Sequence, residues 1–324
     1  MRITISFELK TLLGWIFLTF SSVGLLANLI VALAVFKFAF MKDKSTIFLL
    51  SAFNICNDTI HLFITCFYLA PGIIMDNYLL SDSPSSPISI LISAIFMFCW
   101  YVANITLIVI ALNRLFIICY RNGEFFSRRN LFIIFFLTII FSAIKAYLIQ
   151  YVFPCCAFIV DQAVLSYSYL QIDSLPNWTD KSDIPLNVLT SITNIVCYSL
   201  VFRNIRQSRK CVQDTMKSDE QKRRRKQELS YAIQFSIISV FYTSGWVLFR
   251  IFPIVVGNRG IEWYIMSAAF HTCNCSANAV VYLLGNAEVK NHLLKLFFRR
   301  KSVEYSTTRG ALSVDAQTSQ IAPT

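Results

Sequence analysis

The sequence predicts an all-α integral membrane protein, a bundle of seven transmembrane helices, and three observations support this fold class. The chain of 324 residues is 56% hydrophobic and only 15% charged, whereas soluble domains carry about 25% charged residues. It contains seven apolar runs, and a helix needs about 20 apolar residues to cross a bilayer. Lysine and arginine gather in alternate connections between these runs, as in the cytoplasmic loops of membrane proteins.

Each apolar run is long enough for one span. The first is too long for the core of a signal peptide and lacks a clear cleavage site, so we expect a retained helix. The third exceeds the thickness of a bilayer and should tilt or project beyond it. No internal repeat is visible, which argues against a transporter built from inverted repeats. The expected spans are 12–36, 46–69, 88–118, 131–153, 184–202, 229–252 and 263–284.

The basic residues predict the orientation of the bundle. They gather after the first, third and fifth spans and in the tail, with a dense run at 222–226. The opposite connections hold only Arg2, Lys10, Lys181 and Arg259. Because cytoplasmic loops are the positive ones, we expect the amino terminus outside and the tail inside. The same distribution accounts for the net charge of +11 without any nucleic-acid partner.

These spans divide the chain into four parts. Residues 1–11 are an expected extracellular amino terminus, and 12–284 are the seven-transmembrane bundle. Residues 285–301 are expected to form a juxtamembrane amphipathic helix on the inner leaflet. Residues 302–324, rich in Ser and Thr, are an expected disordered cytoplasmic tail. The apolar face of the amphipathic helix consists of Val289, Leu293, Leu296 and Phe297.

The ten cysteines do not suggest a metal site. Most lie in apolar runs, where cysteine behaves as a small hydrophobe, and no Cys/His spacing suits zinc, so no cofactor is expected. Cys155 and Cys156, in the long outer connection after the fourth span, could pair with Cys66 or stay reduced, and the sequence leaves both alternatives open. Farther along that connection, Asn177-Trp178-Thr179 is an acceptor pattern for N-glycosylation at Asn177.

Polar residues inside apolar spans are functional hypotheses by default. Asp58 lies about halfway along the second span, at a depth comparable to Asn28 in the first and Asn278 in the seventh. A deep carboxylate needs partners, water or a proton, so we expect these three side chains to form one polar network. Separate interhelical hydrogen bonds are the alternative. Arg114 lies near the inner end of the third span, either buried against facing helices or snorkelling to phosphates.

Several motifs together resemble the rhodopsin-like G-protein-coupled receptors. Asn113-Arg114-Leu115 resembles the Asp-Arg-Tyr triplet of that family, and Asn278-Ala279-Val280-Val281-Tyr282 resembles its Asn-Pro-x-x-Tyr motif. Trp246 lies where the family places a rotamer-switch tryptophan, and Asn28 and Asp58 match polar positions of its first two spans. The segments ALNRLFIICY, NICNDTIHL, PCCAFIVDQ and NAVVYLLGNAEVK are most similar to the nematode serpentine chemoreceptors of class X.

The departures from the family pattern are also informative. Asn113 replaces the acid that pairs with the arginine in the family, Ala279 replaces a proline, and no cysteine marks the outer end of the third span. The resemblance implies that Asn113, Arg114, Asn278 and Tyr282 take part in activation and G-protein coupling. It also implies that ligand binding shifts an inactive–active equilibrium.

The resemblance implies a ligand pocket among the outer halves of the third, fifth, sixth and seventh spans. Phe96 lies where amine receptors carry an aspartate, and Thr272 where opsins carry a lysine, so the chain resembles neither in these positions. Lys145 and Arg250 lie toward the outer ends of their spans. If they face inward they favour an acidic ligand, and otherwise they snorkel to headgroups. The pocket candidates are Phe96, Trp100, Lys145, Tyr242, Trp246, Arg250 and His271.

The sequence thus predicts a chemosensory receptor in the plasma membrane, in a sensory cilium if the resemblance holds. Its expected partners are a small environmental molecule, a heterotrimeric G protein, the bilayer, and arrestin at the Ser/Thr-rich tail. A neuropeptide receptor of the same fold is the nearest alternative, and a ligand-gated channel or transporter is a more distant one. The sequence contains no HExxH, GxSxG or phosphate-binding loop, so no motif suggests an enzyme.

Overall fold

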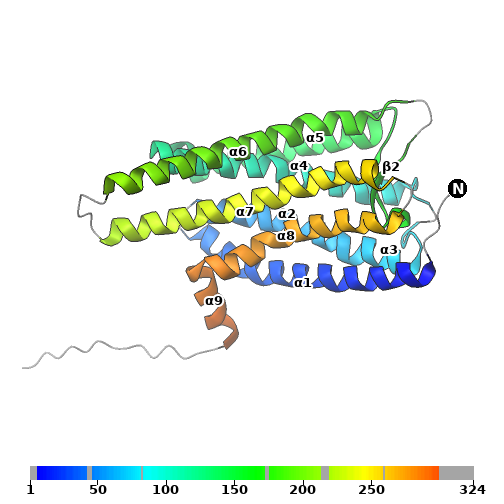
Figure 1. Cartoon of the computed structure of the whole chain (residues 1–324), viewed down its shortest axis with the longest axis horizontal. Coiled ribbons are helices and arrows are strands. Elements are labelled where there is room, and N and C mark those ends of the chain that lie inside the picture. Colours follow the sequence, from blue (N-terminus) through cyan, green and yellow to red (C-terminus); the bar gives the residue numbers. More distant parts are fainter. Residues whose placement is uncertain are drawn as a thin grey trace, which may run out of the picture.

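A computed structural model describes residues 6–41, 46–81, 83–171, 175–212, 219–257 and 260–298. Long helices lie side by side along one axis (Figure 1). One end, here called the hairpin end, carries the start of α1 and a two-stranded antiparallel sheet of β1 (Phe158–Asp161) and β2 (Ser166–Tyr169). Toward the opposite end, called the α9 end, the short helix α9 (Ala287–Phe298) projects across the bundle axis (Figure 1).

The helices of the bundle follow the seven expected spans in order. The second is continuous through a π-helical turn (Thr65–Leu69), and the third and fourth end in π-helical turns at Phe116–Tyr120 and Leu148–Val152. The bundle consists of α1 (Phe7–Phe40), α2 (Ile47–Ile64) with α3 (Ala70–Met75), α4 (Pro87–Leu115), α5 (Arg128–Tyr147), α6 (Trp178–Val212), α7 (Asp219–Val255) and α8 (Ile265–Gly285).

Six described helices are long and apolar enough to cross a membrane. The helix α8 is not among these six, since His271, Asn274 and Asn278 lower its hydropathy. All three of these side chains are buried, so the polar residues of α8 lie inside the bundle. Large apolar side chains such as Phe136 and Ile195 are exposed instead, which suits a surface that faces lipid.

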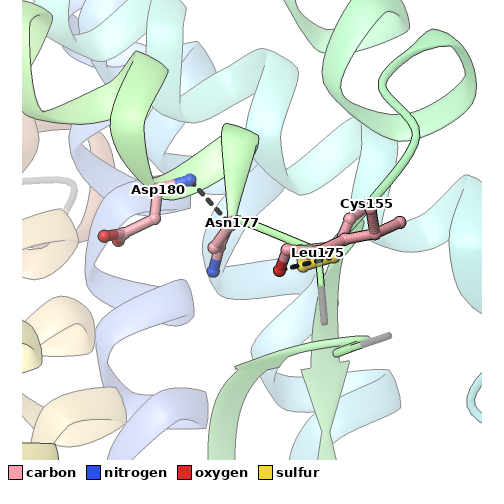
Figure 2. Close-up of a disulfide and its surroundings, with 5 residues drawn as sticks. Cys155, Leu175, Asn177 and Asp180 are labelled. Atoms are coloured by element: carbon pink, nitrogen blue, oxygen red, sulfur yellow. Dashed lines mark hydrogen bonds between the residues drawn. A yellow bond between two sulfur atoms is a disulfide. The ribbon is translucent and has the colours of Figure 1, made fainter. Parts of the chain in front are cut away.

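Capping residues explain where several helices begin. Ser6, Ser86 and Ser127 precede α1, α4 and α5, and each hydroxyl accepts a hydrogen bond from a backbone N–H of the first turn. Asn177 does the same for α6, because its side-chain oxygen accepts from the Asp180 N–H at 2.9 Å (Figure 2). Such caps satisfy donors that a helix cannot pair internally.

The α6 and α7 helices continue past the expected spans toward the α9 end. We expected spans at 184–202 and 229–252, but α6 reaches Val212 and α7 starts at Asp219. The added turns are polar and basic, so a search for apolar residues does not detect them. The side chains of 208–228 lie outside the described part of the chain, as do residues 299–324, which include the expected tail.

The two open alternatives for the outer cysteines are both wrong, because Cys155 and Cys156 are bonded to each other (Figure 2). Both are buried. Cys66 instead contacts the Ser22 hydroxyl at 3.2 Å. Consecutive Cα atoms lie closer together than the usual span of a disulfide, so the sequence favours more distant partners.

The hairpin is fixed to the bundle by polar contacts. The Val160 N–H donates to Ser93 Oγ on α4 at 3.0 Å, and Gln150 Nε2 donates to the Phe158 carbonyl at 3.1 Å. Burial and the Asp161 carboxylate raise the pKa of Tyr78. Tyr78 therefore keeps its proton and donates to Asp161 at 2.8 Å. These contacts hold the hairpin over the interior of the bundle.

Candidate ligand cavity

A cavity of about 50 Å³ lies at the hairpin end, between α4, α6, α7 and α8 and against the β1–β2 hairpin. Its lining is mostly aromatic. A small number of polar groups are set among the rings, the pattern typical of sites for small molecules. The lining residues are Phe96, Met97, Trp100, Phe158, Tyr167, Tyr169, Asp183, Asn187, Tyr242, Gly245, Trp246, Phe249, Arg250, Ser267, His271 and Asn274.

Two histidines belong to the aromatic cluster at the cavity. The His271 ring lies 5.1 Å from Phe96 and 5.6 Å from Trp100, centroid to centroid. His61, on α2, packs edge-on against both Phe96 at 4.5 Å and His271 at 4.7 Å. The described residues contain no group of three His, Cys, Asp or Glu side chains that could hold a metal. The ring contacts place both histidines in the aromatic packing of the cavity wall.

The lysine of α5 does not reach the cavity. Lys145 Nζ lies 3.3 Å from the Asp183 carboxylate and donates to the Ser182 carbonyl at 2.9 Å. It also stands 4.4 Å from the centroid of the Tyr101 ring, and the Tyr101 hydroxyl donates to Asp183 at 2.5 Å. Asp183 thus joins α4, α5 and α6 and has its charge matched by a cation behind the cavity wall.

Arg250 on α7 does line the cavity, but it forms an ion pair with Asp180 on α6. The Tyr169 hydroxyl of the hairpin donates to the same carboxylate at 3.4 Å. The pair is partly exposed, with side-chain exposures of 23% for Arg250 and 29% for Asp180. Lys145 and Arg250 are thus each paired with an aspartate.

Six of the seven predicted pocket residues line the cavity, and Lys145 is the exception. The sequence left open whether Lys145 and Arg250 face inward or snorkel to headgroups. Arg250 faces the cavity and Lys145 does not, and each is paired with an aspartate. In the sequence Asp180 and Asp183 fall in an expected loop or at its edge, whereas the structure places them in the first turns of α6. Their spacing of three residues puts them on one face of a helix, a signal that could have revealed both pairs.

A further polar group beside the cavity was missed by sequence reasoning. The Tyr242 hydroxyl lies 2.8 Å from Asn187 Oδ1 and also contacts Asn104 Oδ1. Asn104 in turn accepts from the Thr190 hydroxyl at 3.1 Å. These contacts join α4, α6 and α7, and Asn187 also lines the cavity. Asn104 and Asn187 offer no recognisable motif, so only their buried amides in the bundle interior reveal them.

The structure brings together two of the three residues of the predicted polar network, Asp58 and Asn278. Asn278 Nδ2 donates to Asp58 Oδ2 at 2.5 Å, which joins α8 to α2. Asn54, which was not predicted, donates to the same oxygen at 3.1 Å. Asn28 bonds instead to the backbone carbonyl of Cys275 on α8, at 3.1 Å. Asp58, Asn54 and Asn278 thus form the network, whereas Asn28 joins α1 to α8 by a separate hydrogen bond, which was the alternative.

The predicted activation residues lie toward the α9 end. Arg114 is fully buried, so snorkelling to phosphates is excluded, and its guanidinium stands 5.7 Å from the centroid of the Phe235 ring. Asn113 is also fully buried, and neither atom of its amide has a partner in the described residues. Tyr282 is hydrogen-bonded to Ser51 on α2. The arginine thus lies between α4 and α7, against an aromatic ring.

The arrangement of helices, with a covered cavity at one end, is the fold of the rhodopsin-like receptors. The structure is similar to the crystal structure of squid rhodopsin, with a TM-score of 0.72, 13% sequence identity, and coverage of 91% of this chain and 87% of that chain. At this identity the likeness establishes the fold alone.

The family follows from the sequence. The model of the serpentine type 7TM GPCR chemoreceptor Srx family matches residues 18–284, and the chain belongs to this family. A comparison with curated proteins gave no match. The membership confirms the resemblance to the class X serpentine chemoreceptors and defines a multi-pass membrane receptor.

We predict that Lys145→Met and Asp183→Asn each destabilise the receptor more than the double variant does. Removing one member of a buried pair leaves an uncompensated polar or charged group, at a cost of about 3 kcal/mol. The check is to measure the thermal unfolding midpoints of the wild type, the two single variants and the double variant in the same detergent. A double variant with a midpoint as low as the sum of the single effects would show that the pair is not coupled.

Proposed function

We propose that this chain is a chemosensory receptor that binds a small, uncharged environmental molecule in the cavity and activates a heterotrimeric G protein. We infer an uncharged ligand because both cations near the cavity are already paired, Arg250 with Asp180 and Lys145 with Asp183. A charged ligand would have to displace one of these partners. A neutral molecule needs only the aromatic rings and the amides of Asn187 and Asn274, which can orient a hydroxyl or carbonyl group.

In this proposal the hairpin end faces the outside and the receptor lies in the plasma membrane of a sensory cilium. The excess of basic residues in the connections at the α9 end supports this orientation. Asn177, the proposed glycosylation site, lies at the hairpin end and is only partly buried. Arrestin binding remains a proposal for the Ser/Thr-rich tail, which lies outside the described residues.

The proposed mechanism is a shift between an inactive and an active arrangement. A ligand that binds the active arrangement more tightly than the inactive one shifts the equilibrium, and the size of the shift is set by the difference between the two affinities. Trp246 lines the cavity on α7, and Phe235 on the same helix packs against Arg114. A displacement of α7 at the cavity would therefore change the surroundings of Arg114, where we place the G-protein contact.

The alternatives fit the cavity less well. A neuropeptide needs a wide opening, whereas this cavity is about 50 Å³ and lies against the hairpin. Channel or transporter function would need a polar path through the bundle, and the buried polar groups at Asp58 are engaged with one another. Family membership also supports a receptor.

We predict that benzyl alcohol and similar uncharged aromatic alcohols activate the receptor at lower concentration than benzoate or benzylamine of matched size. The assay is ligand-stimulated nucleotide exchange on a G protein in membranes that contain the receptor. In Arg250→Gln, Asp180 loses its cationic partner, and the response to benzylamine should rise about tenfold, the equivalent of about 1.4 kcal/mol. A wild-type receptor that benzoate activates at lower concentration than benzyl alcohol would contradict the proposal of an uncharged ligand.

We predict that Asn113→Asp lowers basal signalling. The new carboxylate lies beside Arg114, and a charge-assisted hydrogen bond is about twice as strong as a neutral one. Stabilising the inactive arrangement by about 1 kcal/mol lowers basal activity about fivefold. Nucleotide exchange without ligand, normalised to receptor at the surface, measures this. Asn113→Leu, which adds no charge, is the control, and basal activity in Asn113→Asp equal to or above wild type would count against the idea.

A further inference from the structure

A second hollow lies between α6 and α7, separate from the ligand cavity and nearer the α9 end. These antiparallel helices contact each other along the bundle (Figure 1). The hollow is an open groove of about 330 Å³. Its lining combines the polar side chains of Asn194, Ser199, Ser236, Ser239, Thr243 and Ser244 with the aromatic or apolar ones of Ile195, Tyr198, Phe202 and Val240.

Asn194 is the residue that marks this groove as a binding site. It is 2% exposed and lines the groove. Its amide oxygen and nitrogen both lack a hydrogen-bond partner within the described part of the chain. A buried amide without partners is costly, and a bilayer offers no water at this depth to satisfy it.

The groove opens toward lipid. Ile195 and Val240 lie on its rim and are 62% and 63% exposed, and exposed apolar side chains at this level face hydrocarbon. Among the described residues, no charged side chain lines the groove. The groove therefore offers hydroxyls and one amide among apolar and aromatic side chains, and it is reached from an apolar phase.

We propose that this groove binds an uncharged, lipid-soluble molecule whose polar group carries both a hydroxyl and a carbonyl. The hydroxyl would donate to the Asn194 oxygen, and the carbonyl would accept from the Asn194 nitrogen. The apolar part of the molecule would lie toward Ile195 and Val240. The polar group of such a molecule can form hydrogen bonds with both unpaired atoms of the Asn194 amide at once, whereas an aliphatic chain can bond to neither.

Charged lipids fit a different place. Arg203 and Arg206 line a neighbouring hollow on α6, together with Phe202. Arg203 is nine residues beyond Asn194, which is about 13 Å along a helix. A phosphate or carboxylate would reside at these guanidinium groups, and its hydrocarbon tail would leave the Asn194 amide unsatisfied.

The groove is also connected to the ligand cavity by hydrogen bonds. The hydroxyl of Thr243, in the groove lining, lies 3.4 Å from Ser191 Oγ. Ser191 Oγ in turn accepts from Trp246 Nε1 at 2.9 Å, and Trp246 lines the cavity. An occupant that repositions Thr243 therefore alters the environment of Trp246, so the bound molecule modulates agonist potency. This second part rests on the proposed function.

The binding test uses a photoreactive monoacylglycerol, with a diazirine in its acyl chain, on the full chain in phosphatidylcholine nanodiscs. Labelling should map to α6 and α7 around Asn194. The variant Asn194→Leu, of similar volume, should reduce labelling about tenfold, while Ile192→Leu, at an exposed position of α6 outside the groove lining, should leave it within twofold. A fatty acid and a phosphatidylcholine with the same photoreactive chain should label the wild type and the Asn194→Leu variant equally. Equal labelling of these two proteins by the monoacylglycerol would overturn the site.

The modulation test measures agonist potency with and without unlabelled monoacylglycerol. Wild type should show a shift of threefold or more, and Thr243→Val should retain labelling but lose the shift. A shift that persists in Thr243→Val would overturn the connection through Ser191. Because labelling requires neither an agonist nor a G protein, a receptor that labels but does not signal separates this site from the proposed function.

Discussion

At the hairpin end of the bundle, the Asp183 carboxylate on α6 accepts a hydrogen bond from Tyr101 on α4 and forms an ion pair with Lys145 on α5. Three helices meet at this one buried group. Because the interior of a membrane protein offers little water, a charge there must be balanced by the protein itself. The lysine stays behind the wall, and the cavity lining is mostly aromatic, with amides and with Arg250 paired to Asp180. The expected class of ligand follows from this local balance of charge.

Two helices connect the cavity with the polar network. On α2, His61 packs against Phe96 at the cavity, and Asp58 lies one turn away in the network. On α8, His271 lines the cavity, and Asn278 bonds to Asp58 two turns farther along. A ligand that shifts α8 relative to α2 would change both sets of contacts. We propose on this basis that the network takes part in activation.

Much of the fold could be predicted because its signals are local. Apolar runs identify spans, and serines before 7, 87 and 128 identify helix starts. The depth of Asp58 and Asn278 was also readable, since the helix rise converts sequence position into depth. The ion pairs could not be predicted in this way. Whether the Lys145 side chain points into the cavity or toward Asp183 depends on the rotation of its helix and on where α6 begins. In the sequence, Asp183 lies at the edge of an expected loop.

The site contains other features that sequence reasoning could not supply. Asn104 and Asn187 meet Tyr242 from separate helices, and no motif or spacing relates them. Cys155 and Cys156 pair with each other, although receptors with similar motifs suggest a distant partner. Asn194 looks like any polar residue within a span. Only the positions of neighbouring helices show that its amide lacks a partner among the described residues and that Asn194 lines a groove.

An experimentally determined structure of the receptor with an uncharged agonist bound tests the central claim most directly. The account predicts agonist density among Phe96, Trp100 and His271, under the hairpin, with the Arg250–Asp180 and Lys145–Asp183 pairs intact. An agonist that binds elsewhere, or a ligand carboxylate bound to Arg250 in place of Asp180, would contradict the account.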